Sequence, residues 1–394
     1  MSLKYAKRME NIKASEIREL LKIAQKPGII SFGGGFPAPE LFPVDEMIEI
    51  SKYVIENHGS KALQYGPTEG YEPLRNAIAK RMEKMQAKVQ GKDILVTSGS
   101  QQGLDFTSKL FINPGDTIIL EKPSYLGAIN AFKAYEPNFV DIELEDDGMN
   151  MEELEEALKT TENVKFIYII PDFQNPSGKT WSVEKRMKLV ELGNKYDVAI
   201  VEDNPYGELR FEGELLPSIK HFDTEGRVIY LGTFSKILCP GFRLGWVAAS
   251  PEVLNKYILV KQGADLQSST ISQIEVATYL EQYNIEEHIE KIKETYKRRR
   301  DLMINVMKEE FPKEVKYTIP EGGLFTWVTL PDYMNSRDLA LKALERNVAF
   351  VPGGSFYANG GHENDMRLNY SAMEDDKIVE GMKRLAEVIK AEMK

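Results

Sequence analysis

Cysteine, histidine and tryptophan are scarce in this chain of 394 residues, which contains one, four and three of them. The single cysteine, Cys239, cannot form an internal disulfide, so a disulfide-stabilised scaffold is excluded. The histidines are scattered, and the sequence has no HExxH motif or Cys/His cluster that would bind a transition metal. We therefore expect neither a disulfide framework nor a metal centre.

Long apolar runs and an excess of positive charge are also missing. No stretch approaches the roughly 18 apolar residues of a membrane span, and the first eight residues lack the apolar core of a signal peptide. Fifty Lys and Arg against 61 Asp and Glu give a net charge of -11, so no uniform positive field is available to hold a nucleic acid. These absences predict a cytoplasmic protein with no membrane or nucleic-acid partner.

Between residues 90 and 250 short β-rich runs recur, with helical patterns or loops between them. They are continuously apolar rather than alternating, which indicates strands buried on both faces of a mainly parallel sheet. The helical patterns at 151–160 and 183–196 have the length of crossover helices, so an α/β fold is expected. The expected strands are 94–97, 117–120, 165–170, 198–201, 228–231 and 246–249.

After about residue 270 the pattern changes to a long charged helix, which runs to about residue 310. A strand-like run at 324–330, a helix, a second strand at 366–370 and a closing amphipathic helix follow, and they predict a smaller α+β domain. We predict an N-terminal segment that packs with this small domain, a large domain and the small domain, at residues 1–45, 46–285 and 286–394.

A phosphate site is predicted where the strand at 94–97 turns into a helix. Gly178-Lys179-Thr180 is no nucleotide P-loop, because Phe173 occupies the place of its first glycine, and the spacing from Gly99 is not that of a dinucleotide fingerprint. What remains is a strand, a tight turn and an apolar-periodic helix, which offer free amides and a positive helix end to one phosphate. Taken alone, an N-cap by Ser100 would be the simpler interpretation.

A lysine and an arginine follow the strand at 228–231. Lys236 is predicted to lie at the carboxyl edge of the sheet, where desolvation lowers the pKa of an amine and makes it a usable nucleophile. Arg243, seven positions on, suits a phosphate, to which the hydroxyls of Thr233 and Ser235 would donate. Solvated Lys and Arg side chains are the common alternative.

Two polar turns, around Asn175 and Asp203, follow other expected strands and so fall at the same edge. Singly, each is ordinary turn chemistry. Together, a phosphate cradle, a reactive amine, a buried carboxylate and neutral donors suit an aromatic phosphate cofactor that is bound as an imine.

Six segments, in this order and spacing, resemble the class I and II (fold-type I) pyridoxal-phosphate aminotransferases. The segments at 15–21 and 32–37 resemble the branch of 2-aminoadipate, kynurenine and aromatic aminotransferases. The resemblance implies a three-layer sandwich around a mainly parallel seven-stranded sheet, plus the small α+β domain. The six segments are SGSQQGLD at 98–105, EKPSY at 121–125, NPSG at 175–178, EDNPYG at 202–207, TFSKILCPGFRLGW at 233–246 and MRLNYS at 366–371.

The resemblance also implies the roles of the site residues. Lys236 would form the Schiff base with pyridoxal 5'-phosphate and then move the substrate proton, while Asp203 would keep the pyridine nitrogen protonated. Tyr206 and Asn175 would bind the phenolic oxygen, and Tyr125 would stack on the ring. The phosphate would be held by Gly99, Ser100, Gln101, Thr233, Ser235 and Arg243.

Substrate contacts follow in the same way. Arg367 resembles the arginine that pairs with the substrate α-carboxylate, assisted by Asn175 and the amide of Gly35. Arg18, on one predicted helix face with Ser15, resembles a residue that recognises a distal carboxylate, although an ordinary exposed arginine is almost as plausible. The expected donors are 2-aminoadipate, glutamate, aromatic or branched-chain amino acids, with 2-oxoglutarate as acceptor.

Tyr65 resembles a tyrosine that reaches the cofactor phosphate of a neighbouring subunit, which implies a homodimer. The alternative interpretation is that Tyr65 is an aromatic loop residue that fills a surface groove. Two other functions stay open at this point. One is a β-lyase of the same fold, and the other, more remote, is a non-enzymatic pyridoxal-phosphate-binding regulator.

Overall fold

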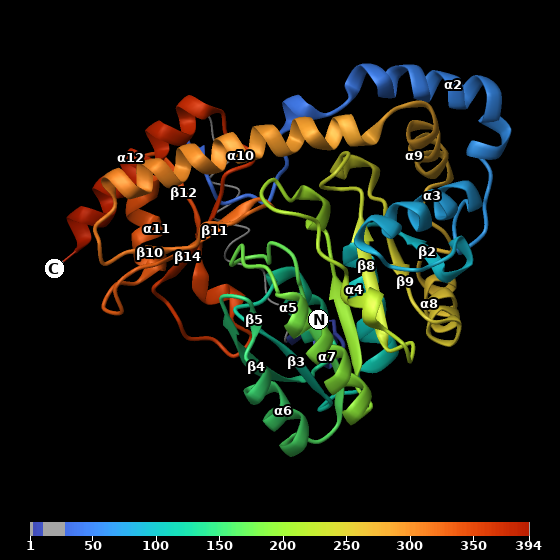
Figure 1. Ribbon diagram of the computed structural model, residues 1–394, viewed down its shortest axis with the longest axis horizontal. Helices are drawn as coiled ribbons and strands as arrows, with labels where there is room; N and C mark the ends of the chain where they lie inside the picture. The colour runs from blue at the N-terminus through green and yellow to red at the C-terminus, as the bar shows by residue number, and fades with distance from the viewer. Residues whose placement is uncertain (1–2, 11–27, 394) are drawn as a thin grey trace.

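The computed structural model describes residues 3–10 and 28–393, which form a large and a small α/β unit joined by one long helix (Figure 1). The large unit is built on a sheet of eight strands, and the small unit on a sheet of four. In spatial order the large sheet is β2 (Ile94–Thr97), β9 (Gly245–Ala248), β8 (Val228–Thr233), β7 (Ala199–Asp203), β6 (Val164–Ile169), β3 (Thr117–Lys122), β4 (Asn138–Glu145) and β5 (Gly148–Met149).

Helices cover both faces of the large sheet, as the apolar runs predict. Along β3, Ile118 and Leu120 join one hydrophobic core, whereas Ile119 joins another on the opposite face, because successive side chains of a strand point to opposite sides. Both faces of the large sheet are therefore shielded from solvent. The first core includes residues of α4 (Ser100–Phe111), α5 (Leu126–Lys133) and α8 (Pro251–Ala264), and the second residues of α6 (Met151–Thr160) and α7 (Val183–Tyr196).

The expected fold class is confirmed, with a difference in strand number. All six expected strands are present, but the sheet has eight strands rather than seven. β4 is absent from the six runs because it lies toward the sheet edge and is not continuously apolar. The first half of β4 is exposed or half-buried, and its second half alternates between buried and exposed residues. β5 is a two-residue return that pairs antiparallel with β4.

The small unit carries the antiparallel sheet β10 (Lys316–Tyr317), β11 (Phe325–Thr329), β14 (Asp365–Asn369) and β13 (Val351–Pro352). The expected long helix after residue 270 is two helices, because Tyr283 and Asn284 leave the helical conformation and the Asn284 side chain caps the next helix at Glu286 N. The helices outside the large sheet are α2 (Val44–Ala62), α3 (Glu72–Met82), α9 (Thr270–Gln282), α10 (Ile285–Glu310), α11 (Ser336–Glu345) and α12 (Asp375–Glu392).

The N-terminal part of the chain is tied to the small unit by a short parallel pair. β1 (Ile30–Ser31) pairs with β12 (Val348–Ala349). α10, the orange helix along the upper side of Figure 1, runs from α9 of the large unit to α12 of the small one. The domain boundaries given above stay a prediction.

The strand order places a topological switch point at the carboxyl ends of β3 and β6. β6, β7 and β8 follow one another in one direction from β6, whereas β3 and β4 lie on its other side, so the chain switches direction between β6 and β3. In such sheets ligands bind beyond the carboxyl ends of the strands at the switch. β9 runs antiparallel to its neighbours, and its first residue therefore lies at this same edge.

Within residues 3–10 and 28–393, no helix combines the length and the apolar character that crossing a bilayer would require.

Candidate active site

A cavity of about 500 Å³ opens at this edge, between the large sheet and the small unit. It is lined by residues from the turns after β3, β6, β7 and β8, from the start of α4, and from β11 and β14. The structure thus brings together most of the residues singled out in the sequence. Those lining the cavity are Gly35, Ser100, Gln101, Tyr125, Asn175, Asp203, Tyr206, Thr233, Ser235, Lys236, Arg243 and Arg367.

Lys236 follows β8 and directs its amine into the cavity. Its Nζ donates to the backbone oxygen of Gly35 at 2.7 Å. Burial, together with the positive charges of Arg367 and Arg243, lowers the pKa of Lys236 to about 8. The amine therefore has a substantial neutral fraction near pH 8, as a nucleophile requires.

Asp203 ends β7 and is only 2% exposed. Its Oδ2 accepts a hydrogen bond from the Tyr168 hydroxyl at 2.8 Å, whereas Oδ1 is buried and has no hydrogen-bond partner within the described part of the chain. Burial raises the pKa of Asp203 to about 7, although the Tyr168 hydrogen bond opposes the shift. A buried carboxylate oxygen of this kind calls for a donor from a bound group.

Arg367 on β14 faces the cavity from the small unit. Its Nη1 donates to Asn175 Oδ1 at 2.8 Å and its Nη2 to the Gly33 oxygen at 2.8 Å. The guanidinium also lies over two aromatic rings, 4.2 Å from the ring centre of Phe325 and 5.1 Å from that of Phe356. Burial lowers the pKa of Arg367 to about 10, and the group remains a cation near neutral pH.

The opposite end of the cavity is formed by the turn between β2 and α4 and by Arg243. Gly99 has a φ of +78°, and a Cβ built at that position would stand 2.6 Å from Arg243 Nη2. Only glycine leaves room for the guanidinium against this turn. Thr233 and Ser235 face the same region, and the hydroxyl of Thr233 donates to Ser235 Oγ at 2.9 Å.

Four of the predicted site residues do not line the cavity. Gly99 lies behind it, against Arg243. Tyr65 is 78% exposed and points to no group of this cavity. Ser15 and Arg18 lie outside the described residues, and their proposed contacts stay predictions.

Three aromatic residues of the site were not identified in the sequence. Tyr168 and Phe325 lie inside apolar strands, where a large side chain is expected to be core, and Phe356 follows a glycine pair without any motif of its own. Their contacts with Asp203 and Arg367 join positions far apart in the chain, so local patterns carry no signal for them.

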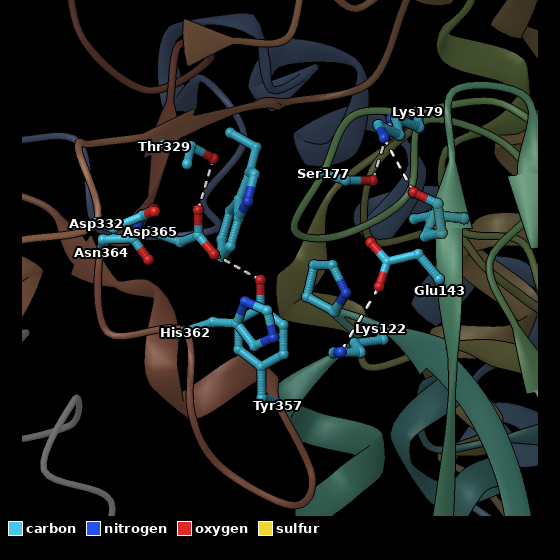
Figure 2. Close-up of a pocket in the computed structure, with 13 residues that line it drawn as sticks. Lys122, Glu143, Ser177, Lys179, Thr329, Asp332, Tyr357, His362, Asn364 and Asp365 are labelled. Atoms are coloured by element: carbon cyan, nitrogen blue, oxygen red, sulfur yellow. Dashed lines mark hydrogen bonds and ion pairs between the residues drawn. The ribbon is translucent and has the colours of Figure 1, made fainter. Parts of the chain in front are cut away.

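A second, smaller cavity of about 280 Å³ is lined by Trp327 and by residues of both units (Figure 2). There Asp365, two residues before Arg367 on β14, accepts hydrogen bonds of 2.6 Å from Thr329 Oγ1 and from the Tyr357 hydroxyl. Tyr357 is next to Phe356, which packs edge-on against Trp327. This cluster holds the aromatic wall that supports Arg367.

Comparison with known proteins agrees with this geometry. Residues 29–385 match the family described as aminotransferase class I and II. The aromatic-amino-acid aminotransferase 1 of Thermococcus litoralis is 51% identical over 395 residues, which cover 99% of this chain and 95% of the relative.

Two solved structures are similar over nearly the whole chain. The kynurenine aminotransferase of Pyrococcus horikoshii, solved in complex with PMP, has a TM-score of 0.95 and 46% identity, covering 99% of this chain and 98% of that one. The α-aminoadipate aminotransferase of Thermus thermophilus, complexed with N-(5'-phosphopyridoxyl)-L-leucine, has a TM-score of 0.92 and 41% identity, covering 98% and 97%.

The fold and the site are those of a pyridoxal-phosphate-dependent enzyme of fold type I. The chain belongs to the class I and II aminotransferase family, and its cofactor is pyridoxal 5'-phosphate.

The residues of the cavity fit this cofactor. Its pyridinium N–H would meet the unpaired Oδ1 of Asp203, and its phosphate would meet Arg243 and the free amides at the start of α4. Lys236 supplies the amine between these two ends. No other lysine lines the cavity formed by the described residues.

Asp203→Asn tests the cost of the buried carboxylate in cofactor-free protein. Because the folded-state pKa is raised above that of the unfolded chain, wild-type stability falls as the pH rises from about 4 to about 7, whereas the variant lacks this loss. At pH 8 the cofactor-free variant should therefore be more stable by about 1 kcal/mol or more, with the difference shrinking toward pH 5.

Thermal unfolding at several pH values measures this difference. Asp146→Asn, a fully exposed carboxylate in a turn, is the control and should leave the melting temperature nearly unchanged. A difference between Asp203→Asn and wild type that is independent of pH would contradict the prediction.

Proposed function

We propose that the protein transfers the amino group of an L-amino acid to 2-oxoglutarate in two half-reactions at this single cavity. The observation that carries the proposal is the placement of three desolvated groups around one space. Lys236 provides an amine, Asp203 an unpaired carboxylate oxygen, and Arg367 a guanidinium at the substrate end.

Bound pyridoxal phosphate supplies an aldehyde that joins covalently to amines and a ring that accepts electron density. Asp203 would hold the proton of the ring nitrogen through Oδ1, and Asn175 and Tyr206 would donate to the phenolic oxygen. The Asn175 amide donates to the Tyr206 hydroxyl at 3.4 Å, so the two groups lie close enough to share that acceptor. Tyr125 would cover the ring, and the phosphate would be held by Ser100, Gln101, Thr233, Ser235 and Arg243.

Arg367 orients the substrate and thereby favours transamination. Its planar guanidinium offers a two-pronged contact to an α-carboxylate, and the rings of Phe325 and Phe356 limit its movement. With the carboxylate held by Arg367, the bond that breaks would be the one between the substrate α-carbon and its hydrogen. Lys236 Nζ would take this proton and later return it, while the bound cofactor would accept the electron pair left behind.

A spectroscopic titration tests the reaction class. Purified protein that carries the cofactor should show a yellow band, and a competent amino donor should bleach it in the absence of any acceptor. 2-Oxoglutarate should restore the band, and Lys236→Met should abolish the cycle, because no other amine of the cavity can replace it. Release of pyruvate and ammonia from the donor without a 2-oxo acid would instead favour the β-lyase.

The substrate range proposed here is 2-aminoadipate, glutamate and aromatic amino acids, with branched-chain donors as further candidates. The relatives named for aromatic amino acids, kynurenine and α-aminoadipate support this range. The apolar wall of Phe36, Phe325 and Phe356 suits the carbon skeleton of a large side chain.

Arg18→Ala tests how a distal carboxylate is recognised. If Arg18 pairs with that carboxylate, the variant should raise the KM for 2-aminoadipate and glutamate about tenfold or more, and leave the KM for leucine and phenylalanine within about twofold. Steady-state kinetics with the four donors measure this, with Arg8→Ala, an exposed arginine, as control. Equal effects on all four donors would exclude the role.

A homodimer is the proposed assembly. α2 and the segment after it expose a series of apolar side chains, and a groove between α2 and residues 239–242 lies just beyond the Lys236 turn. Tyr65, which is exposed and is not among the residues that line the cavity, is therefore proposed to complete the phosphate site of the partner subunit. The exposed side chains are Val44, Ile48, Ile55, Leu63 and Tyr65. Location in the cytoplasm stays a prediction.

Mixing two inactive variants tests whether Tyr65 acts across the dimer. Lys236→Met lacks the amine, and Tyr65→Ala is expected to lose the cofactor at low pyridoxal phosphate concentration. Mixed dimers contain one site with both residues intact, so co-refolded variants should regain about a quarter of wild-type activity. Co-refolding of Lys236→Met with the wild-type protein controls for the procedure. No recovery would show that Tyr65 does not act in trans.

A further inference from the structure

A fully buried lysine lies outside the cavity, against the turn that faces the cofactor phosphate. Lys261 on α8 has 0% exposed side-chain surface. Its Nζ donates to Gln102 Oε1 at 2.9 Å, to both oxygens of Asp265 at 2.9 and 3.0 Å, and to Ser268 Oγ at 3.1 Å. Lysine is rarely buried completely, and burying its charge is costly unless it is paired.

The partners of Lys261 converge on Ser98, the first residue after β2. Gln102 Oε1 also accepts from the Ser98 N–H at 2.9 Å, and Gln102 Nε2 donates to Asp265 Oδ2 at 2.8 Å. The Ser98 hydroxyl donates to the same Asp265 oxygen at 3.2 Å. Ser98 is thus held at its backbone and at its side chain by one network.

The position of Ser98 determines where the phosphate site lies, because Gly99, Ser100 and Gln101 follow it directly. The turn has little freedom to shift, since the α-carbon of Gly99 is packed against the Arg243 guanidinium. The start of α4 therefore lies between Arg243 on the cavity side and the Lys261 network on the other. Lys261 itself is absent from the cavity lining.

We propose that Lys261 is a positioning residue for the cofactor phosphate, acting through Gln102 and Asp265. Its charge is matched by Asp265, so its contribution is to fix the amides at the start of α4 rather than to attract the phosphate directly. The proposal rests on the cofactor site described above, and it assigns a function to a network that the reaction itself does not use.

Comparing two ligands that differ only in the phosphate tests the proposal. Equilibrium dialysis of cofactor-free protein measures the affinity for pyridoxal phosphate and for pyridoxal. Lys261→Met should weaken pyridoxal phosphate binding about tenfold or more and change pyridoxal binding by less than about twofold. Lys256→Met, an exposed lysine on the same helix, should change neither.

Three results would overturn the proposal or separate it from the proposed function. Equal losses for both ligands would show a merely structural role, and unchanged affinity for pyridoxal phosphate would show no role. If Lys261→Met does not fold, Gln102→Leu replaces it, because Gln102 belongs to the same network and lies at the partly exposed start of α4. The same two affinities are then compared. Failure of the wild-type protein to bind pyridoxal phosphate would instead contradict the proposed function.

Discussion

The site depends on ionisable side chains that the fold buries even without a bound ligand. Burial desolvates Asp203, Lys236 and Arg367. It raises the pKa of the carboxyl group and lowers the pKa of the two cations, so that in each case the neutral form is favoured. Each loses hydration that a bound partner must replace. By the proposed roles, the cationic ring of the cofactor would meet Asp203, the substrate carboxylate would meet Arg367, and Lys236 would join the cofactor covalently. The desolvated groups are thus complementary to a bound state.

Sequence patterns predicted the parts of the fold and site that are local. The buried parallel strands are continuously apolar. Asp203 ends one such strand, and Lys236 and Asn175 lie in the loops after two others, so strands and polar groups could be placed without coordinates. β4 was not predicted because its second half alternates between buried and exposed residues, as in a strand that is covered on one face only. Phe325 was not predicted as a site residue, because a buried aromatic residue in a strand has the same sequence pattern whether it packs in a core or contacts a guanidinium.

The proposed substrate end of the cavity is assembled from three separate parts of the chain. Arg367 comes from the small unit, Asn175 from the large one, and Gly33 from the segment before α2, and the guanidinium bonds to both of the others. Tyr357, which neighbours Phe356, donates a hydrogen bond to Asp365 of β14 and so helps to hold the aromatic wall. Such a site exists only when both units are folded and docked, which explains why its aromatic members have no local motif.

The reversed strand β9 has a consequence for how such enzymes diversify. Because β8 and β9 pair as a hairpin, with Thr233 opposite Gly245, the loop between them carries both Lys236 and Arg243. The register of one strand pair therefore sets the positions of both groups together. Substitutions in the small unit and the N-terminal segment can thus alter the other side of the cavity without changing the loop that carries these two side chains.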